Sequence, residues 1–476
     1  MKKNLFLERF FDTKKNQYLF FTIISLAIFL FSMDVGIFWD NVLFTSKIGT
    51  HLYENNLFNW LLPDNLDAGH PPTLGFLLAI LWKVFGQKLW VSHLLMLPFT
   101  IGFLYQLFQL TSYFIKNKIH SFFAFLLIII DPTLSTQFVL VNPEIIQLFL
   151  FLLAINSILY ERYFLKIVAL FFLSIISLRS MLLFGGVFLF EILNLKYIVK
   201  TEKVILSKKL IFSYVIGIIP AIAYLSIHYI EKGWLISHAN SPWSGHRNFV
   251  SLNEFLKNCA VLVHKYIDYG RFIIYFVIIY IFIKFKKSAF SKLTKQLLIL
   301  SFSSVFFIII ASLLSSNPFG HRYFLISYIL LNLLSFLLFV KFLKKKRFVY
   351  CLIFITLITG NLWIYPKEIA QGWDATLAHL PYYSLRLKAI DYLNNNKIEI
   401  EDVASFFPNK TALHHVDFKN DYRSFQDFNK KNNYAFYSNV YNLSDEDYDS
   451  LNTDYNILKE FKNNNIQVIL YILKEK

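Results

Sequence analysis

The sequence predicts an α-helical membrane protein that crosses the bilayer about eleven times and carries a small α/β domain at its C-terminal end. Two observations lead to this fold class. The 476-residue chain is 56% hydrophobic and only 16% charged, which is not the composition of an average soluble protein. Its Lys and Arg residues, which give a net charge of +16, stand in short clusters between apolar runs. Control of membrane topology explains these clusters better than nucleic-acid binding does.

The chain opens on a basic segment, residues 1–17, which runs into the apolar stretch 18–33. No small-residue cleavage site follows that stretch, so a removable signal peptide is not indicated. We therefore expect a retained first span with the N-terminus in the cytoplasm.

A second long apolar run, residues 91–115, ends at Lys116 and Lys118, which mark a cytoplasmic turn. Two cytoplasmic ends must be joined by an even number of crossings. The short apolar piece Leu74–Phe85 should therefore not cross, and it is shorter than the roughly 20 residues that a span needs. We expect it to lie at the outer interface, within one large outer loop of residues 34–90.

The same reasoning extends over the whole membrane part, residues 1–365. A hairpin of two short spans is expected in 167–195, turning outside near Arg179, because basic residues flank both ends of this run. A long outer loop is expected between 230 and 272. The remaining spans are expected at 119–130, 144–160, 210–230, 272–283, 297–315, 323–340 and 348–365. The total of about eleven crossings is odd, which leaves the C-terminus outside.

Beyond Pro366 the composition turns polar, which predicts a soluble extracytoplasmic α/β domain in residues 366–476. A helix is expected at 384–395, and strands are expected at 403–407, 434–441 and 466–474. Residues 444–464 have the apolar spacing of an amphipathic helix, with Ser444 and Asp447 as a capping-box-like start. No catalytic motif is present in this region, so we interpret the domain as a packing or acceptor-docking cap.

Ionisable residues are costly near a membrane, and those that occur there tend to be functional. In this chain acids, histidines and arginines gather at the outer ends of the spans, whereas the cytoplasmic loops carry mostly Lys and Arg. The outer set comprises Asp34, Asp40, His51, Glu54, Asp64, Asp67, His70, Asp131, Glu144, Arg179, His246, Arg247, His321 and Arg322. A polar site is therefore expected at the outer face. The two cysteines, Cys259 and Cys351, have no metal-type or redox-type spacing.

Three stretches on the outer side carry a family pattern: "FWDNVLFTSKIGTHLYENN" at 38–56, "GHPPTLGFLLAILWKVFG" at 69–86 and "LVNPEII" at 140–146. They resemble segments of the GT-C glycosyltransferases, in the group that contains protein O-mannosyltransferases and aminoarabinose transferases. Asp40 matches the first member of that group's acidic pair, and His70 with its two prolines matches the element that opens an interfacial helix. Glu144 matches the acid that follows a proline. The second acid of the pair is replaced by Asn41.

The resemblance implies a GT-C fold and an integral-membrane glycosyltransferase in the plasma (inner) membrane. Such an enzyme takes its sugar from a polyprenyl-phosphate donor and passes it to an acceptor hydroxyl at the extracytoplasmic face. The acceptor, which could be a glycan, a lipid or a protein, is not indicated by the sequence. Membrane lipids are expected partners, and nucleic acid is not.

The chemistry of such a transfer suits the residues on the outer side. A base must take the proton of the acceptor hydroxyl, and Asp40 is our candidate, with Glu144 or Asp34 complementing the missing second acid. The departing lipid phosphate develops negative charge, which cations stabilise. The candidate cations are Arg179, Arg247 and Arg322, because Arg binds phosphate through two hydrogen bonds. His70 is expected to contact phosphate or acceptor. A single base with direct displacement would invert the anomeric centre.

Each candidate also has a purely structural reading. Asp40 could cap the helix that follows it, and His70 could be a turn residue with a satisfied hydrogen bond. Glu144 could be favoured by the dipole at a helix start. Arg322 and Arg247 could extend to lipid phosphates. The two tryptophans of the later outer loop, Trp234 and Trp243, fit interfacial anchors better than sugar-stacking platforms.

Two other classes of function remain open at this stage. A transporter or flippase of lipid-linked sugars would usually place ionisable residues near the bilayer midplane and often shows internal repeats, neither of which we see. A membrane scaffold would leave the outer polar residues unexplained. No metal site is indicated by ligand spacing, although Asp40 and Glu144 could share a divalent cation.

Overall fold

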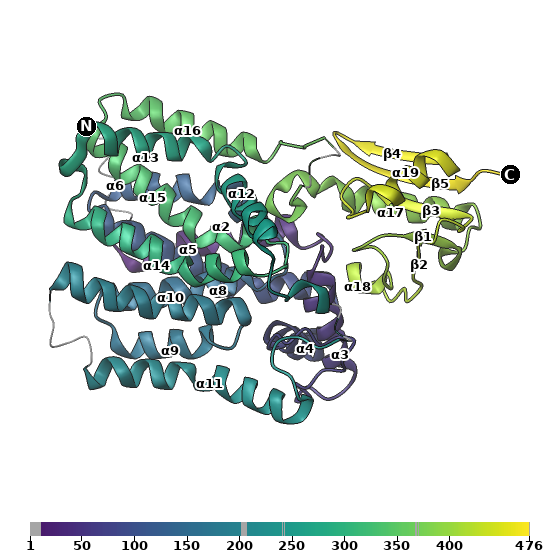
Figure 1. Cartoon of the computed structure of the whole chain (residues 1–476), viewed down its shortest axis with the longest axis horizontal. Helices are drawn as coiled ribbons and strands as arrows, with labels where there is room; N and C mark the ends of the chain where they lie inside the picture. The colour runs from purple at the N-terminus through teal and green to yellow at the C-terminus, as the bar shows by residue number, and fades with distance from the viewer. Residues whose placement is uncertain are drawn as a thin grey trace.

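The computed structural model describes residues 11–200, 207–239, 241, 243–366, 369 and 371–475. The protein is a bundle of roughly parallel helices with a small α/β domain at one end (Figure 1). The start of the basic N-terminal segment and Lys203 lie outside the described residues. The cytoplasmic position of the N-terminus therefore stays a prediction.

Every apolar run predicted to span the membrane holds a helix. These helices are α2 (Lys14–Ser32), α5 (Leu89–Phe114), α6 (Lys118–Ile129), α8 (Glu144–Leu159), α9 (Tyr163–Leu173), α10 (Leu178–Asn194), α11 (Lys208–Lys232), α13 (Phe272–Phe285), α14 (Lys292–Leu314), α15 (Leu325–Phe342) and α16 (Lys346–Gly360). The predicted hairpin is present as α9 and α10, which turn immediately before Arg179.

Length and composition alone support a smaller number of crossings. Among the described helices, six are long and apolar enough to cross a membrane, or up to eight if each of two bent pairs counts as one span. Helices α8 and α9 are apolar but shorter. The chain is thus a multi-pass membrane protein, and the count of about eleven spans stays a prediction.

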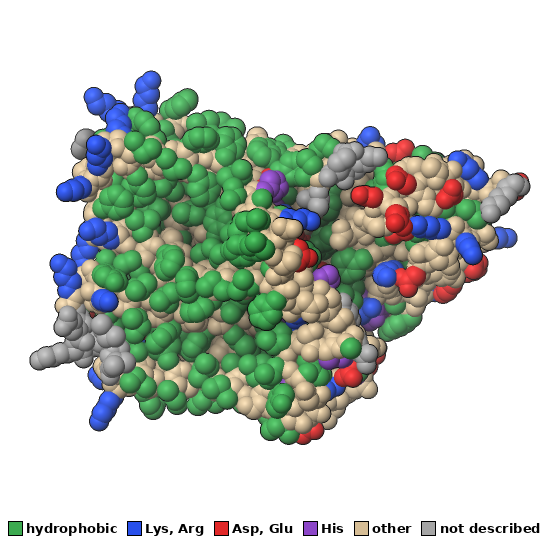
Figure 2. Space-filling model, viewed as in Figure 1, with side chains coloured by type: hydrophobic (Ala, Val, Ile, Leu, Met, Phe, Trp, Pro, Cys, Tyr) green, Lys and Arg blue, Asp and Glu red, His purple; other side chains and the backbone are tan. Residues whose placement is uncertain are grey.

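The surface of the bundle has the division expected for a protein in a bilayer. Hydrophobic side chains cover its sides, and Lys and Arg side chains gather at the end away from the α/β domain (Figure 2). Inside, the helices pack closely. A Cβ on Gly186 of α10 would lie 2.8 Å from the carbonyl oxygen of Ser303 on α14, so only glycine permits this approach. By the positive-inside rule, we expect the basic end to be the cytoplasmic end.

This orientation predicts a labelling pattern. A cysteine at Asn65 or Asn253 should react with a membrane-impermeant thiol reagent on intact cells, because both side chains are exposed near the α/β domain. A cysteine at the exposed Lys287, in the turn between α13 and α14, should not react. The two native cysteines are first replaced by serine. Labelling at position 287 in sealed cells would reverse the assignment of the two faces.

The outer loop folds into short helices at the domain end of the bundle. They are η1 (Val42–Lys47), a π-helix, α3 (Ile48–Glu54) and α4 (Thr73–Phe85). Helix α4 begins directly after Pro72 and ends at Phe85, where Gly86 adopts a left-handed φ of 83°. The resemblance predicted both limits of this helix, whereas its position at a membrane interface stays a prediction.

Two further helices lie in segments that we expected to be loops, α7 (Pro132–Val139) and α12 (Leu252–Ile267). Helix α7 starts with Asp131 as the cap and proline in its first turn. Helix α12 starts with a capping box of Ser251 and Glu254. Both starts are visible in the sequence, but a search for long apolar runs passes over short or amphipathic helices.

The remaining short helical segments connect these elements. They are η2 (Leu195–Val199), η4 (Ser244–His246), η5 (Lys286–Ala289), η6 (His321–Phe324), η7 (Trp373–Ala375), η8 (Leu377–His379) and η9 (Ile400–Asp402). Three of them, η4, η6 and η7, carry residues of the site described below.

The C-terminal domain is a five-stranded mixed sheet in the order β2-β1-β3-β5-β4. Strand β1 is parallel to β2 and β3, and β5 is antiparallel to β3 and β4. Its elements are α17 (Pro381–Asn395), β1 (Val403–Ser405), α18 (His414–Asp417), β2 (Gln426–Asp427), β3 (Tyr434–Ser438), α19 (Asp445–Asp454), β4 (Tyr455–Asn463) and β5 (Ile466–Leu473). The expected helix at 384–395 and the three expected strands are all present.

One expectation for this domain was wrong. The segment 444–464 is not a single amphipathic helix, because α19 ends at Asp454 and the rest forms β4. The predicted start is correct: Ser444 Oγ accepts from the Asp447 amide at 3.1 Å and donates to its carboxylate at 2.8 Å. The second half of the segment has helical apolar spacing, but it forms strand β4 because it pairs with β5 across a tight turn at Asn464.

The C-terminal domain is fixed to the bundle by a shared hydrophobic core. Val35 and Phe38 of the outer loop and Leu140 after α7 are buried together with Leu385 and Leu393 of α17. The Phe38 ring also stacks on the ring of His379, with centroids 4.4 Å apart. The domain is therefore seated directly on the outer segments, and the site lies at this junction.

Candidate functional site

A cavity of about 720 Å³ lies where the outer loop, the ends of the helices and the C-terminal domain meet. Its wall includes all six residues predicted to act in the site: Asp40, His70, Glu144, Arg179, Arg247 and Arg322. His246 and Trp243 also line it. Asp34, the other acid considered as a partner for Asp40, is not part of this wall. Segments far apart in the sequence thus supply one polar cavity.

Arg322 is the centre of the charged cluster. It lies on η6, directly before α15, and only 7% of its surface is exposed. Its guanidinium bonds to the Asp40 carboxylate, and its Nε lies 3.2 Å from Asp374 and 3.6 Å from Glu144. Three carboxylates therefore surround one cation. This placement contradicts the reading in which Arg322 extends to lipid phosphates.

Glu144 is shared between two arginines. It is the first residue of α8, where the helix dipole favours an acid. Its Oε1 accepts from Arg179 at 2.7 Å, and the Arg179 guanidinium lies 3.5 Å above the Tyr323 ring. Glu144 Oε2 is buried and has no hydrogen-bond partner among the described residues. The position of Glu144 fits the dipole reading, and its role in the site stays a prediction.

Asp40 does not cap the helix that follows it. The residue before η1 is Asn41, and no side chain caps this segment. The main-chain carbonyl of Asp40 accepts from the amides of Leu43 and Phe44, while its carboxylate bonds to Arg322. The prediction that Asp40 could cap the following helix was therefore wrong. Its side chain lines the cavity instead.

His70 is held in place by the helix hairpin and by α11. Its Nδ1 accepts from the amide of Leu178 at 3.3 Å, and its carbonyl accepts from the Tyr224 hydroxyl at 2.9 Å. Burial lowers the pKa of His70 well below its usual value, and the nearby arginines lower the pKa further. The ring is therefore neutral, and with Nδ1 accepting, its proton is on Nε2.

The segment before His70 is fixed by Asp67. One oxygen of Asp67 accepts from the Gly69 amide at 2.8 Å, and the other contacts His228 of α11 at 3.0 Å. Gly69 has a left-handed φ of 70°, and a Cβ there would lie 2.7 Å from the carbonyl oxygen of Ile236. This turn requires glycine and presents His70 and Pro71 toward the cavity.

Arg247 reaches the same turn from the later outer loop. It donates to the carbonyl of Ala68 at 2.5 Å and also to the carbonyl of Ile236. Burial lowers the pKa of Arg247, and no carboxylate forms an ion pair with it among the described residues. Arg247 therefore has no ion-pair partner among these residues, in contrast to Arg322, although the charge of Asp67 opposes the lowering of its pKa. Its side chain lines the cavity.

Sequence reasoning missed Asp374. It lies on η7, in the connection between α16 and the C-terminal domain, and Gln137 of α7 donates to its carbonyl at 2.6 Å. Burial raises the pKa of the Asp374 carboxyl, and Asp40 and Glu144 raise it further, against the opposing effect of Arg322. The segment "GWDATLAH" offers no catalytic motif, so only the fold reveals this third acid.

The comparisons with known proteins agree with this architecture. The crystal structure of ArnT from Cupriavidus metallidurans bound to undecaprenyl phosphate superposes with a TM-score of 0.53 over 96% of this chain and 98% of that chain. The sequences are 10% identical. The chain has the GT-C fold. No protein-family model matches the sequence, and neither does any curated protein.

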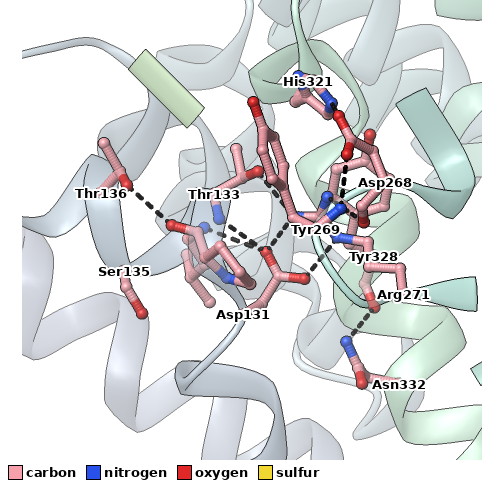
Figure 3. Close-up of polar contacts among 12 residues, drawn as sticks. Asp131, Thr133, Ser135, Thr136, Asp268, Tyr269, Arg271, His321, Tyr328 and Asn332 are labelled. Atoms are coloured by element: carbon pink, nitrogen blue, oxygen red, sulfur yellow. Dashed lines mark hydrogen bonds and ion pairs between the residues drawn. The ribbon is translucent and has the colours of Figure 1, made fainter. Parts of the chain in front are cut away.

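Behind the cavity of this GT-C fold lies a second buried polar network (Figure 3). Arg271 binds Asp131, the cap of α7, through two hydrogen bonds of 2.7 Å, and its guanidinium lies 3.9 Å above the Tyr328 ring. His321 contacts Asp268 at 2.8 Å. Because His321 directly precedes Arg322, this network fixes the start of η6.

Helix α7 connects this network to the acids of the cavity. Asp131 caps its first turn. At its other end, Gln137 holds the Asp374 carbonyl and accepts from Asn142 at 2.9 Å. Asn142 in turn accepts from the Glu144 amide at 3.0 Å. Two of the three acids around Arg322 are thus positioned by one short helix.

The two tryptophans occupy different places in the GT-C fold. Trp243 lines the cavity and stacks on Phe44 at 4.8 Å. Trp234 packs inside the loop against His228 and His238. Neither arrangement tests their predicted role as interfacial anchors.

No group of three or more metal-ligand side chains suited to a metal ion occurs in the described part of the chain. Arg322 contacts both Asp40 and Glu144, the pair that could share a divalent cation.

Proposed function

We propose that the protein is an integral-membrane glycosyltransferase that moves a sugar from a polyprenyl-phosphate donor to an acceptor hydroxyl at the extracytoplasmic face. The observation that carries this proposal is the cavity at the non-basic end of an apolar bundle, in which Asp40, Glu144 and Asp374 face Arg322 while Arg247 has no ion-pair partner among the described residues. The GT-C fold, seen also in an ArnT structure bound to undecaprenyl phosphate, supports it.

The two ends of the cavity suit the two halves of a direct displacement. At the acidic end, Asp40 accepts the proton of the acceptor hydroxyl, and the oxygen of that hydroxyl attacks the anomeric carbon of the donor sugar. The bond between that carbon and the donor phosphate oxygen breaks, and polyprenyl phosphate leaves. Because one displacement occurs, the configuration at the anomeric carbon inverts.

The departing phosphate fits the end at which Arg247 and His70 lie. Arg247 is a cation without a carboxylate partner, and a neutral His70 with its proton on Nε2 can donate one further hydrogen bond. Arg322, in contrast, is already neutralised by three acids. Its role is then to orient Asp40 and to stabilise charge that develops at the reacting centre.

A transporter or flippase would keep its ionisable cluster near the middle of the membrane. The cluster around Arg322 instead lies beside the C-terminal domain, which contributes Asp374. A buried ion pair that lies among the helices, Lys166 with Glu191, is satisfied by a further bond from Tyr214. These features favour transfer at one face over passage through the bundle.

The direct test is to incubate membranes that contain the protein with radiolabelled polyprenyl-phosphate sugars and to follow the label. We expect label to move from the lipid to an acceptor, and the released lipid to be polyprenyl phosphate. Movement of intact labelled lipid between the leaflets without transfer would support a flippase instead.

Removing the donor-phosphate contacts should weaken binding of the lipid product. Arg247→Ala should raise the Kd for undecaprenyl phosphate roughly ten- to hundredfold, the value of one hydrogen bond between charged groups. His70→Ala should have a smaller effect, because a neutral ring donates a weaker bond. Equilibrium binding of the lipid to purified protein in detergent measures both.

Lys232→Ala is the matched control for that experiment. Lys232 is a cation of the same outer region, but it pairs with Asp64 at 2.9 Å and does not line the cavity. Its loss should leave lipid affinity unchanged. Equal loss of affinity in the control and in Arg247→Ala would show that the donor phosphate does not bind at this end of the cavity.

A further inference from the structure

Lys47 is a cation in the cavity wall that the transfer reaction described above does not use. It is the last residue of η1, is half-buried, and lines the cavity. Its ammonium group has no ion pair or hydrogen bond within the part of the chain that the structure describes. Burial lowers the pKa of Lys47, and the charge of Lys410 lowers it further. Lys47 and Lys410 thus both line this cavity, close enough for their charges to interact.

Lys410 is a lining residue from the C-terminal domain, between β1 and α18. It pairs with Asp427 at 2.7 Å, but both side chains are largely exposed, so this pair contributes little stability and can open. The next residue, Thr411, also lines the cavity, and its buried hydroxyl has no hydrogen-bond partner among the described residues. A buried hydroxyl without a partner is costly unless a ligand satisfies it.

We propose that Lys47, Lys410 and Thr411 form a subsite for an anionic group, a phosphate or a carboxylate, carried by the acceptor. Two ammonium groups supply charge-assisted hydrogen bonds to such an anion, and the threonine hydroxyl supplies a third donor. The lysines repel each other in the empty cavity. An anion that lies between them attracts both, and this attraction offsets the repulsion. This inference rests on the proposed function and names the class of acceptor.

The location separates this subsite from the donor phosphate. The charged neighbours of Lys47 are Lys410 and His415, both in the C-terminal domain. The charged neighbour of Arg247 is Asp67, and the charge of Arg247 also lowers the pKa of His70. Asp40 lies two residues before the start of η1, and Lys47 is its last residue. An acceptor anchored at Lys47 therefore reaches toward the proposed base with its hydroxyl.

The test uses sn-glycerol 3-phosphate, a small molecule that carries hydroxyl groups together with an anionic phosphate. Glycerol is its neutral counterpart. Purified full-length protein is treated with acetic anhydride at increasing concentrations of either compound, and acetylation of each lysine is measured by mass spectrometry. We expect glycerol phosphate to protect Lys47 and glycerol not to. Lys88, exposed and outside the cavity wall, should be acetylated equally in all samples.

A second measurement uses variants and equilibrium binding of the same probe. Lys47→Gln should raise its Kd roughly ten- to hundredfold, and Lys88→Gln should not change it. Arg247→Gln should weaken binding of undecaprenyl phosphate and leave protection of Lys47 by glycerol phosphate intact. Protection of Lys47 by undecaprenyl phosphate but not by glycerol phosphate would assign Lys47 to the donor and overturn the proposal, as would equal protection by glycerol.

These binding results do not depend on turnover. If label never leaves a polyprenyl-phosphate sugar while Lys47 is still protected by glycerol phosphate, the proposed transfer fails and the anion subsite stands. If transfer occurs and Lys47 is unprotected, the subsite fails and the transfer stands.

Discussion

Asp40→Asn should leave a folded, membrane-inserted protein whose glycosyl transfer is reduced by roughly two to four powers of ten, the usual contribution of a general base. The fold should tolerate the change because the carbonyl of residue 40, not its side chain, receives the amides of Leu43 and Phe44. An amide of the same shape can still accept from Arg322, but it cannot take the acceptor proton. Transfer rates and the thermal unfolding midpoint are measured side by side.

The matched control is Asp64→Asn, which removes an outer carboxylate that pairs with Lys232 away from the cavity wall. It should retain full activity. If Asp40→Asn is active and Glu144→Gln is not, Glu144 is the base and Asp40 only orients Arg322. If both variants transfer sugar at the rate of the unaltered protein, the chemistry does not occur at this cluster.

Arg322→Ala should lower both activity and stability. Loss of one charge-stabilising donor at a reacting centre costs about a hundredfold in turnover. In addition, Asp40, Glu144 and Asp374 would face one another without the cation between them. Breaking a buried ion pair in this way costs about 3–5 kcal/mol of folding free energy. The unfolding midpoint in detergent should therefore fall together with the transfer rate.

Arg322→Lys separates the two effects. A lysine restores the positive charge, so much of the stability should return, but one ammonium cannot reproduce a planar guanidinium that contacts three acids. We expect turnover to recover only in part. Arg423→Ala, which removes a surface pair with Asp421, is the control and should change neither property. Full turnover in Arg322→Ala would show that this arginine serves packing alone.

Much of the membrane architecture was readable from the chain alone. Long apolar runs bounded by basic clusters predicted every helix that holds an expected span, although not α7 or α12, because a span must be apolar over its whole length and its flanks obey a charge rule. The start of α4 after Pro72 was equally visible, since proline acts on its own backbone and its direct neighbours. These are local constraints, and the sequence determines them by itself.

The sequence predicted many of the residues that form the candidate site, but not their roles. Its six predicted residues do line one cavity, because ionisable side chains are costly in a membrane and gather at its outer edge. Their roles depended on contacts across the chain. Asp40 does not cap its helix, and Arg322 does not extend to lipid, because each is the other's partner in the folded protein.

What the sequence determined by itself was the class of protein, the helices that hold the expected spans and the polar residues that line one cavity. The tertiary structure alone decided that Asp374 joins the acids around Arg322, that Lys47 and Lys410 line the same cavity, and that residues after Asp454 form a strand. The physical reason is the same in each case. These outcomes depend on which distant segments pack together, and no local spacing or propensity encodes the energy of a contact between them.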